Sequence, residues 1–261
     1  MGILIDHLRK KPVNIIITNV CNLKCGGCTQ HCGLIPKEKL YFIDEEQFLK
    51  SVSVASKMHQ NVHLFGGEAC LHPNIENFLS STSDFPNNRF FLWTNGRYKT
   101  IGEQVTTQYQ GTSYSHPAYK NVVVQVDFSK KGRSFAPTLI APTDVLPPCP
   151  QEDYFKFYAQ KHCFVWKYCS MIFYGNQAYA CECAGSFDKM GDSVHGWEIK
   201  DNLLDSLTDE DVVTQMTQFC YRCGLCLPPD IRKKYDQKTD DPALFSQTNQ
   251  DLVNLRLPKF M

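Results

Sequence analysis

Three cysteines near the start of the chain stand at a spacing that could hold a metal cluster. Cys21, Cys25 and Cys28 form a Cys-x3-Cys-x2-Cys pattern directly after an apolar stretch. A structural zinc site takes four protein ligands, so three thiols cannot complete one alone. Three thiolates on a cubane iron–sulfur cluster would instead leave one iron open to a further molecule. Cys32 could supply a fourth thiol, and a zinc ribbon is therefore the alternative.

A second group of cysteines occurs in the C-terminal third of the chain. Its members are Cys163, Cys169, Cys181, Cys183, Cys220, Cys223 and Cys226. Their short spacings suit zinc as well as iron. The chain holds 13 cysteines in all, an odd number, whereas secreted disulfide scaffolds are usually short and have even counts. Metal or redox chemistry in the cytoplasm is therefore predicted, not a disulfide framework.

The first group must be positioned by the elements around it, and these have the pattern of a parallel sheet. Residues 13–20 are apolar and β-branched, as in a strand buried on both faces. Further strands are predicted over 61–65, 89–94 and 121–128. Helices are expected after the N-caps Asp44 and Asn74. Functional sites form in loops at the carboxyl ends of such strands, where the first cysteines lie.

These features together resemble the radical S-adenosylmethionine (SAM) superfamily. The resemblance rests on the cysteine spacing after a first strand and on the Gly-Gly-Glu run at 66–68 after a second. It implies that Cys21, Cys25 and Cys28 hold a [4Fe–4S] cluster whose open iron binds S-adenosylmethionine. It also implies reductive cleavage of SAM to a 5′-deoxyadenosyl radical that abstracts a hydrogen atom from substrate. A reductant such as flavodoxin or ferredoxin would supply the electron.

The resemblance also indicates which residues contact the cofactor. They are Gly66, Gly67, Glu68, Asn95, Gln125 and Asp127. Gly66 and Gly67 lack a Cβ and would let the backbone approach the methionine end of SAM closely. Two positions depart from the family pattern. Gly27 stands where an aromatic residue usually helps to seat the adenine, and Ala69 where proline often follows.

The second cysteine group is similar to a twitch domain, the shortened form of the SPASM extension, which carries one auxiliary cluster. The resemblance implies that the ligands of a second [4Fe–4S] cluster are Cys169, Cys181, Cys220 and Cys223. A two-residue hairpin turn at Gly175-Asn176 would pair Tyr174 with Gln177 and Cys169 with Glu182. Strict alternation then puts Cys169 on the face opposite Cys181, so a bulge or strand end must redirect it. Cys163, Cys183 and Cys226 remain alternative ligands, and zinc remains the alternative metal.

The predicted architecture is α/β. Residues 1–148 form an incomplete (β/α) barrel with parallel strands, because too few residues precede the proline-rich segment 136–150 for a complete barrel of about 250 residues. Residues 149–230 form a small cysteine-rich β-hairpin and helix domain, in which a helix after Thr208 leads to Cys220. Residues 231–261 form a C-terminal tail.

Composition narrows the choice of partners. The chain has 27 basic and 27 acidic residues, so no field of one sign points to nucleic acid or to an anionic membrane. No stretch approaches the roughly 20 apolar residues that span a bilayer, and the N-terminal apolar run is too short for a signal peptide. A cytoplasmic protein without a membrane partner is predicted.

The leading functional hypothesis is an oxidoreductase or isomerase that oxidises or rearranges a polar small molecule, such as a sugar, cyclitol or nucleotide. The catalytic base is not assigned, although Arg97, Asp127 and Arg133 lie near predicted strand ends. The same chemistry on a ribosomally made peptide or a modified nucleobase is an alternative. A zinc-binding interaction module is the alternative outside enzymes.

Overall fold

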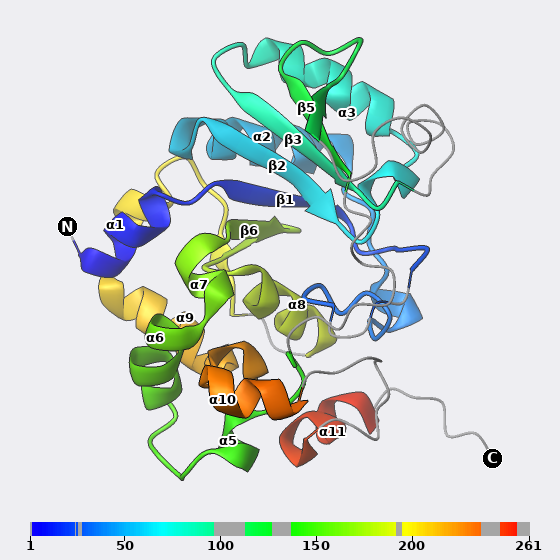
Figure 1. Ribbon diagram of the computed structural model, residues 1–261. Helices are drawn as coiled ribbons and strands as arrows, with labels where there is room; N and C mark the ends of the chain where they lie inside the picture. Colours follow the sequence, from blue (N-terminus) through cyan, green and yellow to red (C-terminus); the bar gives the residue numbers. More distant parts are fainter. Residues whose placement is uncertain are drawn as a thin grey trace.

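A single eight-stranded sheet organises the chain (Figure 1). The computed structural model describes residues 2–23, 25, 28–96, 113–126, 137–191, 195–235 and 246–254. The strands follow the order β4-β5-β3-β2-β1-β6-β7-β8. Their bounds are β1 Val13–Thr18, β2 Asn61–Gly66, β3 Arg89–Thr94, β4 Ser113–Ser115, β5 Val122–Val126, β6 Met171–Tyr174, β7 Gln177–Tyr179 and β8 Trp197–Glu198.

Helices connect and cover these strands. The α-helices are α1 Ile3–Arg9, α2 Glu45–Met58, α3 Ile75–Ser81, α5 Pro142–Val145, α6 Gln160–His162, α7 Phe164–Tyr168, α8 Glu182–Met190, α9 Asp209–Cys220, α10 Pro229–Arg232 and α11 Gln247–Asn254. A π-helical turn covers Tyr154–Ala159, and short 3-10 helices cover Lys37–Lys39, Ala69–Leu71, Thr82–Asp84, Leu204–Ser206, Gly224–Cys226 and Lys233–Tyr235. In the described part of the chain, no helix combines the length and apolar character needed to cross a bilayer.

The central strands confirm the α/β prediction. β5, β3, β2, β1 and β6 pair in parallel, and β4, β7 and β8 add antiparallel pairings at the two edges. Every residue of β1 is buried, as expected for a strand covered on both faces. Five parallel strands are fewer than the eight of a closed (β/α) barrel, which fits the predicted incomplete barrel.

Local signals in the sequence explain how the helices start. The Asp44 side chain accepts a hydrogen bond from the Gln47 backbone N–H, which confirms Asp44 as the N-cap of α2. Asn74 occupies the N-cap of α3 but makes no side-chain capping bond. Thr208 caps α9 and forms a reciprocal capping box with Asp211. These local bonds fix helix starts without tertiary help.

The C-terminal hairpin is a continuation of the same sheet. β6 and β7 turn at Gly175-Asn176, where Gly175 has a φ of +61°, and Tyr174 pairs with Gln177 as predicted. β6 also pairs in parallel with β1, which places residues about 160 positions apart side by side. The predicted division of the chain between residues 148 and 149 stays a prediction.

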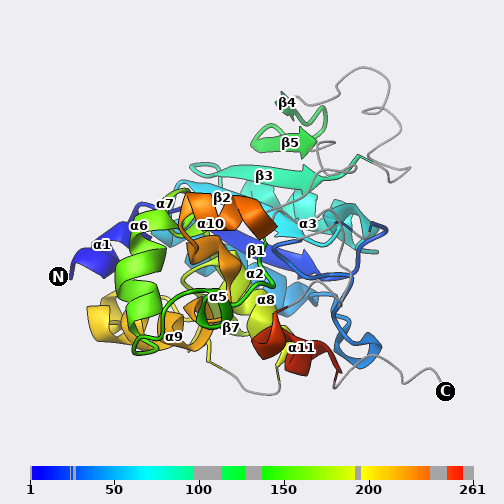
Figure 2. The same cartoon turned by 60° about the horizontal axis from the view of Figure 1, so that its bottom comes forward.

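The N-terminal helix α1 packs against this part of the fold. α9 packs against α1 and α8, as Figures 1 and 2 both show. The backbone N–H groups of Leu4 and Ile5 each donate to Asp209 Oδ1, at 3.0 Å. A carboxylate from the start of α9 thus satisfies otherwise unpaired donors at the start of α1.

Candidate active site

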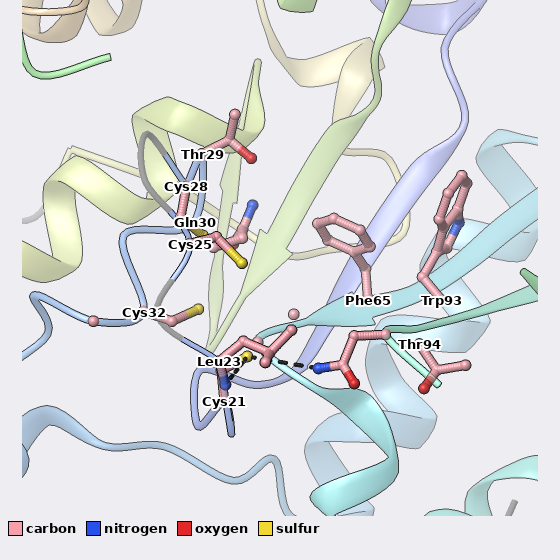
Figure 3. A pocket seen from close by; sticks show the side chains of 14 residues that line it. Cys21, Leu23, Cys25, Cys28, Thr29, Gln30, Cys32, Phe65, Trp93 and Thr94 are labelled. Carbon is pink, nitrogen blue, oxygen red and sulfur yellow. Dashed lines mark hydrogen bonds between the residues drawn. The ribbon is translucent and has the colours of Figure 1, made fainter. Parts of the chain in front are cut away.

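The first cysteine group lines a pocket beyond the carboxyl end of β1 (Figure 3). Cys21, Cys25 and Cys28 all line this pocket, which we call the cysteine pocket. The other described residues that line it include Gln30, Cys32, Phe65, Gly66, Gly67, Trp93 and Asn95. The structure therefore brings together the three predicted ligands and the Gly-Gly-Glu loop, which are about 40 positions apart in the sequence. Gly27, the departure at the adenine position, lies outside the described residues.

The glycines of the Gly-Gly-Glu run line the cysteine pocket and also pack closely against the end of β1. A Cβ on Gly66 would stand 2.1 Å from the Thr18 carbonyl oxygen, and one on Gly67 would stand 2.3 Å from that of Val20. Gly66 also has a φ of +145°, which side chains disfavour. The backbone N–H of Gly67 donates to Thr18 O at 2.8 Å. The missing Cβ atoms thus let this loop hydrogen-bond to the end of β1, and the predicted approach of these glycines to a cofactor stays a prediction.

Glu68 is a buried connector between two strand ends. Its side chain is 0% exposed. One carboxylate oxygen accepts from the Cys70 backbone N–H at 3.0 Å, and the other accepts from the Asn95 backbone N–H at 2.7 Å. Because Asn95 follows β3, Glu68 fixes the loop after β2 to the loop after β3. It acts as a positioning residue. Glu68 is not among the described residues that line the cysteine pocket.

Asn95 reaches the first cysteine loop directly. Its Nδ2 donates to Asn22 Oδ1 at 2.8 Å and lies 4.0 Å from Cys21 Sγ. Gln125 lies on β5 in register with Trp93, so both side chains share one face of the sheet. Gln125 is not among the residues that line the cysteine pocket. Asp127, Arg97 and Arg133 fall outside the described residues.

The donor set of the cysteine pocket fits a cluster of soft metal ions. Its described lining contains four thiols and no carboxylate or imidazole, a set that suits zinc or iron–sulfur clusters. Burial raises the pKa of the Cys21 thiol to about 11. Among the described residues, no three His, Cys, Asp or Glu side chains are already arranged around a metal position. The fit therefore rests on donor chemistry.

A buried amide in the same pocket has no partner. Gln30 is 4% exposed, and its Nε2 has no hydrogen-bond acceptor among the described residues. An unpaired buried donor costs about 1–3 kcal/mol. An occupant that offers an acceptor in the cysteine pocket would remove this cost.

The cysteine loop is clamped to α8 by a histidine that sequence reasoning missed. His31 has a φ of +49° and is 2% exposed. Its ring nitrogens contact Ser186 Oγ at 3.0 Å and Thr138 Oγ1 at 3.2 Å. Ser186 Oγ also donates to Thr29 O at 2.7 Å. Burial lowers the pKa of His31 to about 3, so the ring is neutral at physiological pH. No spacing in the sequence marks this residue.

The second cysteine group is buried where several helices begin or end. Cys181 and Cys163 are the N-caps of α8 and α7, and each sulfur accepts a backbone N–H at 3.4 Å. Cys220 ends α9, and Cys223 precedes the next 3-10 helix. Burial raises the pKa values of three of these thiols, and repulsion from neighbouring sulfurs raises them further; the three are Cys163, Cys181 and Cys220. The sulfurs of Cys163, Cys181, Cys220 and Cys223 thus share one neighbourhood.

Cys169 lies apart from that neighbourhood. It follows α7, and the predicted pairing of Cys169 with Glu182 does not form, because β6 begins at Met171 and Glu182 already belongs to α8. Burial raises its pKa to about 12, and the nearby Glu182 raises it further. Cys169 thus lies between the end of α7 and the start of β6, outside the hairpin pairing.

Lys11 is a second residue that sequence reasoning missed. It is 5% exposed, its ammonium donates to the Trp166 carbonyl, and Nζ lies 4.6 Å from the centre of the Trp166 ring. Burial lowers the pKa of Lys11 to about 8, and the charges of Cys181, Cys163 and Cys169 oppose this shift. A cation therefore faces the second cysteine group. In the sequence, Lys11 reads as part of a solvated basic run before Pro12.

A larger cavity lies beside the cysteine pocket. Its volume is about 510 Å³, within the range usual for small-molecule sites. It shares Thr29, Phe65 and Trp93 with the cysteine pocket. On its other side it is lined by residues of α7 and by Cys169 and Glu182. We call it the central cavity, because it lies between the two cysteine groups.

Comparison with known proteins finds structural likeness only. No protein-family profile and no curated protein sequence matches the chain. The crystal structure of BtrN in complex with AdoMet and 2-DOIA shares 17% sequence identity over 87% of this chain and 91% of that chain, with a TM-score of 0.45. Selenomethionine BtrN in an open conformation shares 14% identity over 92% and 95%, with a TM-score of 0.42. Likeness at this level assigns neither family nor activity to this chain.

Proposed function

We propose that this chain is a radical SAM enzyme that cleaves SAM reductively to a 5′-deoxyadenosyl radical and abstracts a hydrogen atom from a small-molecule substrate. One observation carries the proposal. Cys21, Cys25 and Cys28 line one pocket together with Gly66 and Gly67 from the loop after β2. The sequence predicted both segments at the carboxyl ends of parallel strands, and in the fold they line the same pocket.

The residues of the cysteine pocket would have two roles, binding the cluster and binding SAM. Cys21, Cys25 and Cys28 would hold a [4Fe–4S] cluster, which supplies the electron that breaks the sulfonium C–S bond of SAM. Gln30 offers its unpaired Nε2 donor to an acceptor of the bound cofactor. Asn95, held by Glu68, would contact the cofactor beside Cys21. Predicted contacts from Gln125 and Asp127 remain part of the proposal.

We further propose an auxiliary [4Fe–4S] cluster in the second cysteine group. Cys181, Cys220 and Cys223 are three of its ligands. The shared surroundings of Cys163 with these sulfurs favour Cys163 as the fourth ligand over Cys169, which was predicted. Cys183, whose side chain pairs with that of Cys223, and Cys226 remain alternatives. Lys11 would offset part of the negative charge that four thiolates bring into the core.

The substrate would bind in the central cavity, which adjoins the cysteine pocket and reaches toward the second group. A polar small molecule such as a sugar, cyclitol or nucleotide fits its volume, and the reaction would be an oxidation or a rearrangement. Peptide and nucleobase substrates remain alternatives. Reduction by flavodoxin or ferredoxin and a cytoplasmic location belong to the same proposal.

Metal analysis and SAM cleavage test the proposal together. Protein purified and reconstituted without oxygen should bind about eight irons, and the Cys21→Ala/Cys25→Ala/Cys28→Ala variant about four, because each cubane holds four. With dithionite and SAM, only the wild type should form 5′-deoxyadenosine. Cys70→Ala, which removes a buried thiol outside both groups, is the control and should retain all irons.

Single variants in the second group assign the fourth ligand. Cys163→Ala should lose the auxiliary cluster, and Cys169→Ala should keep it; the reverse result would restore the ligand set predicted from the sequence. If the wild type binds about four irons and the triple variant binds none, the proposal of an auxiliary cluster is rejected. If the protein binds zinc but no iron and forms no 5′-deoxyadenosine, the proposal of a radical SAM enzyme is rejected in favour of a zinc-binding interaction module.

A further inference from the structure

The central cavity has aromatic walls on two sides. Phe65 of β2 and Trp93 of β3 form one wall, with ring centres 6.1 Å apart and planes at 84°. Figure 3 shows these two side chains next to each other on neighbouring strands. Phe164 and Tyr168 of α7 form the other wall, with ring centres 5.4 Å apart.

The wall on α7 is unusual because it faces solvent. Phe164 is 57% exposed and Tyr168 is 72% exposed, although both line the cavity. They stand four residues apart, which places them on one side of the helix. Covering exposed aromatic side chains at the rim of a cavity with a flat, apolar surface removes them from water and stabilises the complex. The cavity therefore favours an occupant with a flat ring.

Polar groups between the walls favour a ring that carries nitrogen or carbonyl groups. Trp93 Nε1 is buried and has no hydrogen-bond acceptor among the described residues. His63 lies beside it, with ring centres 5.9 Å apart, and its Nδ1 pairs with Asn14 Oδ1 at 3.0 Å. Because Asn14 Oδ1 is an acceptor, Nδ1 carries the proton and Nε2 of His63 is an acceptor. Beside the aromatic wall, Trp93 thus offers a donor and His63 an acceptor.

Charge in the cavity argues against a phosphate. Glu182 is the one Asp, Glu, Lys or Arg among its described lining residues. A carboxylate next to a phosphate is repulsive, and a neutral ring avoids this cost.

We propose that the central cavity binds a planar, uncharged nitrogen heterocycle of nucleoside size between the α7 aromatic pair and the Phe65–Trp93 wall. This inference rests on the proposed function, since the heterocycle is the substrate or a part of it. It narrows the substrate class from polar small molecules in general to compounds with a nucleobase-like ring.

Binding measurements on the reconstituted, SAM-saturated protein test this inference. Isothermal titration calorimetry would use uridine and guanosine, their 5′-monophosphates, and myo-inositol as probes. We expect at least one nucleoside to bind with a Kd below about 1 mM, and its monophosphate to bind more weakly. Phe164→Ala and Tyr168→Ala should each weaken nucleoside binding by between about 5-fold and 100-fold, the usual range for base–aromatic stacking.

Phe157→Ala is the matched control. Phe157 is 65% exposed, lies in the preceding π-helical turn and does not line the cavity, so this variant should bind nucleosides as the wild type does. Binding of myo-inositol alone, no binding by any probe, or nucleoside binding that Phe164→Ala and Tyr168→Ala leave unchanged would each overturn the inference.

The inference and the proposed function fail separately. Formation of 5′-deoxyadenosine without heterocycle binding would retain the enzyme and reject the heterocycle. Stacking-dependent nucleoside binding without any SAM cleavage would retain the cavity and reject radical chemistry.

Discussion

The two cysteine groups differ in where their sulfur atoms lie. Cys21, Cys25 and Cys28 are half-buried on a loop and line an accessible pocket. Cys181, Cys220 and Cys223 are buried at helix ends within the core. A loop group can exchange molecules with solvent, whereas a group in the core cannot do so without local unfolding. The difference indicates one site for a diffusible ligand and one that is part of the folded framework.

The two groups are nevertheless mechanically connected. α8 begins at the residue after Cys181, and its Ser186 contacts both His31 and the Thr29 carbonyl oxygen of the first cysteine loop. One helix therefore contacts both groups.

Thiol labelling should give the largest difference between the groups. In metal-free protein under native conditions, iodoacetamide should modify Cys25 and Cys28 about a thousandfold faster than Cys220, because exposing a core thiol requires local unfolding that costs about 4 kcal/mol. Mass spectrometry of timed samples measures both rates. Equal rates in the folded protein would erase the contrast between an accessible and a sealed group.

Two glycines, one beside each group, should respond unequally to alanine. Gly66→Ala should lower the free energy of unfolding by about 3 kcal/mol or more, because its Cβ would lie 2.1 Å from Thr18 O. Gly175→Ala in the hairpin turn should cost only about 1 kcal/mol, since φ is positive there too but the nearest atom to the added Cβ, Lys189 Nζ, would be 3.8 Å away. Urea unfolding compares them, and equal losses would show that φ, not the close approach to β1, sets the cost.

Removal of the clamp between the groups should have an intermediate effect. His31→Ala should lower the free energy of unfolding by about 2–3 kcal/mol, because a buried ring and its contacts with Ser186 and Thr138 are lost. It should also speed the labelling of Cys28 while leaving that of Cys220 unchanged. His116→Ala, on the segment after β4, is the control with little effect expected. Unchanged Cys28 labelling would argue against His31 as the anchor of the loop.

His63, which lines the central cavity between the two groups, should make the free energy of unfolding depend on pH. Burial lowers the pKa of His63 to about 4, so the folded protein keeps the ring neutral while the unfolded chain binds a proton below about pH 6.5. Stability from this group therefore falls as pH drops from about 6.5 toward 4, by about 2 kcal/mol between pH 7 and pH 5. In His63→Gln, the loss between these pH values in urea unfolding should shrink by that amount. If the variant loses as much unfolding free energy between pH 7 and pH 5 as the wild type, the pKa of His63 in the folded protein is close to its ordinary value.

Local chemistry made much of this fold predictable. The apolar run before Cys21 formed β1, Asp44 and Thr208 capped their helices, and Gly175-Asn176 formed the turn. Each depends on residues within a few positions of one another. The pairing of Cys169 with Glu182 was wrong for the same reason, because alternation along a hairpin ignores where helices on either side interrupt the strands.

The sequence by itself determined which residues could bind a metal and which strands would lie beneath them. Only the tertiary structure decided that β6 joins β1, that Cys163 shares the surroundings of Cys181, and that Lys11 and His31 are buried beside the two groups. Spacing and periodicity report on neighbours along the chain, whereas these contacts join residues more than 100 positions apart in most cases. Such contacts depend on how whole elements pack, which local patterns do not encode.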